Sequence, residues 1–154
     1  MAKEIERKFL VRDDSYRALA KQTRSIVQGY LSCRPDSTVR VRIVDDEAYL
    51  TVKSKNYGCL RGEWEYQIPI DDAKELLNLC EPESVIIEKT RYIIEVEDLK
   101  WEIDEFHGGL NGLVVAEIEL PSEDTSFELP SFIGQEVTGD PKYYNSNLSK
   151  LSHE

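Results

Sequence analysis

Hydrophobic and polar residues alternate with a period of two along most of this chain. In residues 4–11, EIERKFLV, the charged positions Glu4, Glu6 and Lys8 fall on one side of an extended backbone. Alternation of this kind is typical of a β-strand. The same pattern, bounded by turn residues, predicts eight strands. They cover residues 3–11, 24–33, 38–44, 48–55, 61–70, 85–97, 99–106 and 113–120.

Short turns and three helical segments complete the predicted architecture. The turn signals are RPDS at 34–37, DDE at 45–47, NYG at 56–58 and HGGLNG at 107–112. Strands joined by such short turns are antiparallel neighbours. The expected helix N-caps are Asp14 or Ser15, Asp71 or Asp72, and Asp140 followed by Pro141. This order of elements predicts an α+β fold dominated by one antiparallel sheet.

The polar faces of the predicted strands carry like charges in close succession. The acids are Glu4, Glu6, Glu63, Glu65, Glu102, Asp104, Glu117 and Glu119. The bases are Lys8, Arg40, Arg42, Lys53, Lys55, Arg61, Lys89 and Arg91. A face selected for solubility alone would mix the two signs within each strand, because like charges side by side repel.

Two interpretations of these charged faces stay open at this point. In the first, an open sheet buries its hydrophobic face under the helices and exposes its charged face to water. In the second, the eight strands close into a barrel with a charged lumen, and closure removes the sheet edges. A charged lumen is stable only if the charges pair or hold ligands. Clustered Lys and Arg side chains suit an oligo-anion, and clustered carboxylates suit Mg²⁺ or Mn²⁺.

Composition narrows the class of protein. The 154 residues favour one domain, and the net charge of −11 argues against a nucleic-acid surface and against an anionic membrane face. The first residues lack the apolar run of a signal peptide, and no stretch approaches the length of a membrane-spanning helix. Three widely spaced cysteines match neither a disulfide framework nor a zinc site. We therefore expect a cytoplasmic protein.

The order of the charged motifs resembles that of a known family. The motifs are E-I-E-R-K at 4–8, T-V-R-V-R at 38–42, T-V-K at 51–53, E-W-E-Y at 63–66, K-T-R-Y at 89–92, W-E-I-D at 101–104 and A-E-I-E-L at 116–120. In this order they resemble the CYTH superfamily, the triphosphate tunnel metalloenzymes. The resemblance implies a single CYTH domain over residues 1–154 and a closed eight-stranded antiparallel tunnel that binds a triphosphate with a divalent metal.

The details resemble one subgroup of that superfamily. EIERKFLV, QGYL, KTRY, GLVVAEIEL and YYNSNL are similar to segments of short prokaryotic tunnel enzymes that hydrolyse inorganic tripolyphosphate. Two alternatives remain: a class IV-type adenylate cyclase, which converts ATP to cyclic AMP and pyrophosphate, and a non-catalytic barrel that binds polyphosphate. In each case the expected partner is a small molecule that bears a triphosphate.

The resemblance also assigns roles to individual residues. The implied ligands of Mg²⁺ or Mn²⁺ are Glu4, Glu6, Glu117 and Glu119. The implied phosphate-binding residues are Lys8, Arg40, Arg42, Lys53, Lys89 and Arg91. Glu63, Glu65, Glu102 and Asp104 would support them. Tyr30, Lys8 and Lys89 are the candidate catalytic residues, with Tyr30 or a metal-bound hydroxide as proton acceptor. Trp64 and Tyr66, on an outward face, would suit a homodimer contact.

Overall fold

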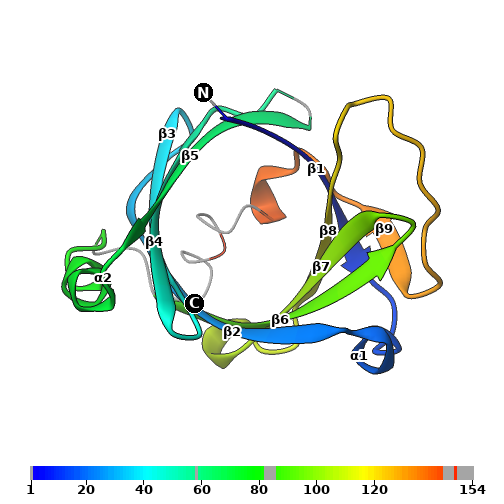
Figure 1. Ribbon diagram of the computed structural model, residues 1–154, viewed down its shortest axis with the longest axis horizontal. Coiled ribbons are helices and arrows are strands. Elements are labelled where there is room, and N and C mark those ends of the chain that lie inside the picture. The colour runs from blue at the N-terminus through cyan, green and yellow to red at the C-terminus, as the bar shows by residue number, and fades with distance from the viewer. Residues whose placement is uncertain (1, 58, 82–85, 144–147, 149–154) are drawn as a thin grey trace.

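Eight strands close into a barrel, and a short ninth strand lies against its outer side (Figure 1). This computed structural model describes residues 2–57, 59–81, 86–143 and 148, with residues 2–4 described by their backbone alone. The strands are β1 Ala2–Val11, β2 Gln22–Arg34, β3 Ser37–Val44, β4 Glu47–Ser54, β5 Leu60–Ile68, β6 Ile87–Val96, β7 Leu99–Phe106, β8 Val114–Glu119 and β9 Ile133–Glu136. The predicted antiparallel α+β fold is confirmed, and closure excludes the open-sheet interpretation.

Strand β1 closes the barrel because it pairs with two partners along its length. The hydrogen-bonded order runs β5-β4-β3-β2-β6-β7-β8-β1, and β1 also pairs with β5. Residues Ala2–Ile5 lie opposite β5, and residues Glu6–Leu10 lie opposite β8. The first and eighth strands are therefore neighbours, as closure of the barrel requires. Because the side chains of each strand alternate between its two faces, every second residue points into the lumen.

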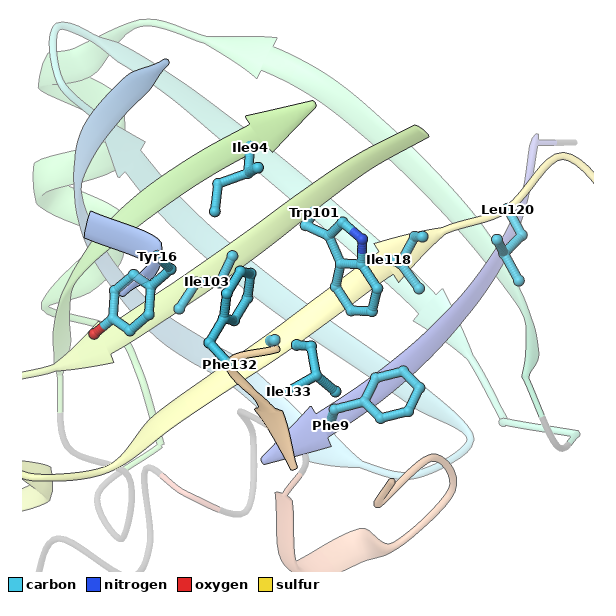
Figure 2. Close-up of a cluster of buried hydrophobic side chains, with 10 residues drawn as sticks. Phe9, Tyr16, Ile94, Trp101, Ile103, Ile118, Leu120, Phe132 and Ile133 are labelled. Carbon is cyan, nitrogen blue, oxygen red and sulfur yellow. The ribbon is translucent and has the colours of Figure 1, made fainter. Parts of the chain in front are cut away.

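A hydrophobic layer covers one outer side of the barrel. Figure 2 shows it over β1, β6, β7 and β8, where Phe9 and Trp101 lie with ring centroids 5.6 Å apart. Phe132 and Ile133, from the segment after β8, complete this layer. The segment continues into β9, which pairs with the end of β1 and was not predicted from the sequence. Four residues, Ile-Gly-Gln-Glu, are too short and too polar to show an alternating pattern.

Helix α2, Ile70–Leu77, covers a second outer side over β2, β3 and β4. Its Ala73 is fully buried with Val41 and Ala48. The expected cap was wrong by two or three residues: Pro69 is the N-cap, and the two aspartates at 71 and 72 lie in the first turn instead. There the carboxylates still face the positive end of the helix dipole.

The remaining helices are short. Helix α1 spans Tyr16–Leu19 with Ser15 as N-cap, and 3₁₀ helices span Gly108–Leu110 and Pro141–Tyr143. The Asp140 carboxylate accepts a hydrogen bond from the Lys142 amide at 3.1 Å, as an N-cap does. Apart from Leu148, the rest of the expected last helix lies outside the described residues. None of the helices in the described ranges has the length and apolar character needed to cross a membrane.

Candidate functional site

The lumen contains a polar cavity of about 180 Å³. It is lined by Glu6, Lys8, Tyr30, Thr38, Arg40, Arg42, Thr51, Lys53, Arg61, Glu63, Glu65, Arg91, Lys100, Glu102, Glu117 and Glu119. Every strand from β1 to β8 contributes at least one of these side chains. The alternating charges of the sequence therefore converge on one space inside the barrel.

The acidic side of the cavity is formed where β1 meets β8. The register places Glu6 opposite Glu119 and Lys8 opposite Glu117. The Lys8 Nζ atom lies 3.3 Å from a Glu117 carboxylate oxygen. Burial alone would raise the pKa of Glu117, but Lys8 and a hydrogen bond with Glu6 lower it well below its usual value.

The acids at this position fit a divalent cation by their chemistry. Glu6, Glu117 and Glu119 all line this part of the cavity. Their oxygens are the donors that Mg²⁺ and Mn²⁺ prefer. The backbone of Glu4 pairs with Arg61, but its side chain lies outside the described residues. Among the side chains that are described, no group of three or more His, Cys, Asp or Glu residues is close enough to hold a metal.

The basic side of the cavity is centred on Arg40 and Arg42 of β3. The Arg40 Nη2 atom lies 3.7 Å from Glu65 and 3.4 Å from the Thr51 hydroxyl. Its Nε atom is buried and has no hydrogen-bond partner among the described residues. A buried donor without a partner is unfavourable, and an anion in the cavity would satisfy it.

Arg42 differs from the other luminal bases in its partners. Its Nε atom donates a hydrogen bond of 3.0 Å to the Gln28 side-chain oxygen. Within the described ranges, no carboxylate lies within ion-pair distance of its guanidinium. Burial, together with the charges of Arg40 and Arg91, lowers the pKa of Arg42 to about 9. The positive charge of Arg42 is therefore poorly compensated by the described side chains.

Lys89, Arg91 and Asp104 form a buried ion cluster beside the cavity. Asp104 accepts two hydrogen bonds from the Arg91 guanidinium, at 2.8 and 2.9 Å, and lies 2.8 Å from the Lys89 ammonium. Arg91 also contacts Glu102 at 3.2 Å. Of the three, Arg91 alone is part of the cavity lining. Lys89 is held behind it, with its side chain fully buried over the Phe106 ring.

The electrostatics of this cluster follow from the pairing. Burial would raise the pKa of Asp104, but Arg91 and Lys89 lower it well below its usual value. Burial lowers the pKa of Lys89 to about 7, with Asp104 opposing the shift and Arg91 reinforcing it. Asp104 is therefore the carboxylate that fixes the Arg91 guanidinium at the cavity wall.

Tyr30 lies at the centre of the basic side and is almost fully buried. Its hydroxyl accepts a hydrogen bond of 3.3 Å from the Gln28 amide nitrogen. Gln28 itself is completely buried between Tyr30 and Arg42. Gln28 carries no charge, and the sequence pattern gave it no role.

Several lining residues were not predicted. Thr38 and Thr51 carry no charge, so the charge pattern could not identify them. Lys100 lies two residues before Glu102 on β7, and that spacing was a usable signal. Arg61 was named only among the bases of the polar faces, and it lines the cavity and donates hydrogen bonds to the Ser54 carbonyl oxygen and the Thr38 hydroxyl.

Together these features define a class of protein: a closed antiparallel barrel whose lumen is built to hold a small polyanion beside clustered carboxylates. The chain belongs to the CYTH domain family, whose model matches residues 2–153. The family implies dependence on a divalent metal.

Curated relatives match over almost their whole length. An inorganic triphosphatase of Acetivibrio thermocellus is 52% identical over 151 residues, which cover 97% of this chain and 95% of the relative. An inorganic triphosphatase of Nitrosomonas europaea is 38% identical over 153 residues, which cover 95% and 96% of the two chains.

Solved structures agree with this assignment. The crystal structure of an inorganic triphosphatase has a TM-score of 0.67 and 34% identity, and the alignment covers 96% of this chain and 97% of that chain. A Hippeastrum protein described as a proposed adenylyl cyclase with a dominant triphosphatase activity has a TM-score of 0.60 and 19% identity, over 77% and 80% of the chains. At that identity the likeness shows the fold alone.

Proposed function

We propose that this protein is a divalent-metal-dependent triphosphatase, with inorganic tripolyphosphate as its preferred substrate. The observation that carries the proposal is the pair Arg40 and Arg42, whose buried donors face the cavity without full compensation by the described residues. An oligophosphate offers the acceptor oxygens and the negative charge that these donors lack. The two curated triphosphatases and the family support the same reaction. We further propose that residues 1–154 form one CYTH domain.

In this mechanism the basic side of the cavity holds the phosphate chain. Arg42 and Arg91 present guanidinium groups to phosphate oxygens, and Arg40 and Lys53 approach from β3 and β4. Phosphoryl transfer requires little covalent chemistry from a protein, so positioning and neutralisation of charge supply most of the rate enhancement. Asp104 holds Arg91 in place, and Lys89 supports Asp104 from behind.

The acidic side would hold the metal. Glu6, Glu117 and Glu119, with Glu4 from the same strand as Glu6, are the proposed ligands. When bound, Mg²⁺ or Mn²⁺ would neutralise charge on the phosphate oxygens and activate a water. Lys8 lies beside these acids, where its ammonium contacts Glu117 at 3.3 Å and the Tyr143 carbonyl oxygen at 3.0 Å.

Tyr30 is the proposed proton-handling residue. Its side chain lines the cavity, and its hydroxyl accepts a hydrogen bond from Gln28. There it can orient a water or a phosphate oxygen. Its exclusion from bulk water favours a fixed hydrogen-bond geometry.

The experiment that tests this function is a substrate panel with product identification. Purified protein is incubated with tripolyphosphate or ATP in Mg²⁺ or Mn²⁺, and orthophosphate, pyrophosphate and cyclic AMP are measured. We expect orthophosphate from tripolyphosphate. Cyclic AMP with pyrophosphate from ATP would instead assign a cyclase, and tight binding without turnover in either metal would assign a polyphosphate-binding barrel. Light scattering on the same preparation measures its molar mass and so tests the proposed homodimer. The proposed dimer contact involves Trp64 and the exposed Tyr66.

A further inference from the structure

Gln28 occupies a position that the proposed mechanism leaves unexplained. Its side chain is completely buried on the inner face of β2. It contacts two residues of the cavity lining, Arg42 through its oxygen at 3.0 Å and Tyr30 through its nitrogen at 3.3 Å. A buried amide that bridges two lining residues is suited to fixing their orientation.

The chemistry of the partners determines which way the amide points. A guanidinium can only donate hydrogen bonds, so the oxygen of Gln28 must face Arg42. The nitrogen of Gln28 then faces Tyr30, and its N–H donates to the phenolic oxygen. The orientation of the Gln28 amide is therefore fixed by the Arg42 guanidinium, which donates hydrogen bonds but cannot accept them.

This orientation decides where the Tyr30 hydrogen goes. Because the phenolic oxygen accepts a hydrogen bond from Gln28, its own O–H points elsewhere. Among the described residues it has no second hydrogen-bond partner, and the side chain lines the cavity. The free direction of the O–H bond is therefore toward the space in which a phosphate would lie.

We propose that Gln28 is a positioning residue that holds the Tyr30 hydroxyl with its hydrogen directed at the bound triphosphate, while it aligns the Arg42 guanidinium on the same group. The inference rests on the proposed triphosphatase function. It extends that function, because it turns Tyr30 and Arg42 into one coupled unit in which the uncharged Gln28 sets both geometries.

The variant Gln28→Glu tests this coupling, because a carboxylate still accepts from Arg42 but has no N–H for Tyr30. The Tyr30 hydroxyl would then donate to residue 28, and its hydrogen would leave the cavity. We expect kcat for tripolyphosphate to fall by about tenfold, the size of one net hydrogen bond. The added negative charge beside Arg42 should raise KM as a separate effect.

A double-mutant cycle with Tyr30→Phe separates the two effects. In the Tyr30→Phe background, Gln28→Glu should raise KM but lower kcat no further, because the hydroxyl is already absent. The proposal would be overturned if Gln28→Glu lowered kcat by the same tenfold in the Tyr30→Phe background. It would also be overturned if Gln28→Glu alone left kcat unchanged. Gln67→Glu is the matched control, since Gln67 is exposed on β5 outside the cavity lining and the substitution should leave kcat unchanged.

A readout without turnover keeps this inference separate from the proposed function. In protein labelled at the tyrosine ring carbon that bears the hydroxyl, the resonance absent from Tyr30→Phe is that of Tyr30. We expect this resonance to move in Gln28→Met, while those of the other tyrosines stay in place. An unmoved resonance would overturn the hydrogen bond itself. Wild-type protein that releases no phosphate would overturn the proposed function and leave this test intact.

Discussion

Arg42→Met should increase the stability of the barrel while it removes substrate binding. The guanidinium is partly buried near Arg40 and Arg91, and no carboxylate of the described residues pairs with it. Met has a similar length and no charge, so it can occupy the same space. Most core substitutions destabilise a protein, which makes a gain in stability a demanding prediction.

The magnitude follows from the electrostatics of the site. The pKa of Arg42 is lowered from its usual value to about 9, a change that corresponds to about 5 kcal/mol against the charged form. Because the unfolded chain holds this proton more tightly, the penalty is fully present below about pH 9 and disappears as pH rises toward the pKa of an unperturbed arginine. The substitution leaves the Gln28 oxygen without its donor, which opposes the gain by roughly 1–3 kcal/mol.

We therefore expect the free energy of unfolding at pH 7 to rise by about 2–4 kcal/mol, and Tm by roughly 4–16 °C. Affinity for tripolyphosphate should fall at least about 100-fold, because two charge-assisted hydrogen bonds are lost. Urea unfolding and calorimetric titration measure the two quantities on one preparation. Arg12→Met is the control, since Arg12 is exposed outside the cavity and should change neither.

Loss of stability in Arg42→Met would refute the electrostatic reasoning, because it would mean that the charge is compensated within the protein. Retained affinity in a stable variant would refute the role of Arg42 in holding phosphate. Each outcome contradicts a different part of the account.

Three further predictions concern the acids. Asp104→Asn should lower the free energy of unfolding by about 3–5 kcal/mol, because Arg91 and Lys89 lose a buried partner. Urea unfolding measures this change, and an unchanged urea midpoint would contradict the prediction. The pKa values of Asp104 and Glu117 are lowered, so their stabilisation is present above the usual carboxyl pKa and is lost on acidification. Tm of the wild type should therefore fall between about pH 5 and pH 3, and less steeply in Asp104→Asn. Chelation of divalent metal should abolish phosphate release without unfolding the protein. The Glu117→Gln variant should need about 10–100-fold more Mg²⁺ for its half-maximal rate. An unchanged metal requirement would exclude Glu117 as a ligand.

Much of the fold could be predicted because the period of two is a local property. Whenever Arg40 faced the lumen, Arg42 had to face it too, and the same holds for Glu117 and Glu119. The family resemblance added closure, which local alternation could not supply. Strand β9 was missed because its four residues are ordered by contacts with β1 rather than by their own pattern.

The pairing of charges within the lumen could not be predicted, because it depends on register between strands distant in sequence. Lys89 and Arg91 are two residues apart on β6, so both lie on the same face of the strand and the sequence pattern cannot distinguish them. The register with β7 places Asp104 opposite Arg91 and Phe106 opposite Lys89. Lys89 is thereby held behind the cavity wall while Arg91 lines it. Gln28 carries no charge, so only its position between two lining residues revealed it.

The most direct test of the central claim is to follow tripolyphosphate by phosphorus NMR in the presence of Mg²⁺ and the wild-type protein. The account predicts that the tripolyphosphate signal is replaced by pyrophosphate and orthophosphate in equal amounts, and that Arg42→Met stops the conversion while the protein remains folded. A persistent tripolyphosphate signal with folded wild-type protein, in Mn²⁺ as well as Mg²⁺, would contradict it.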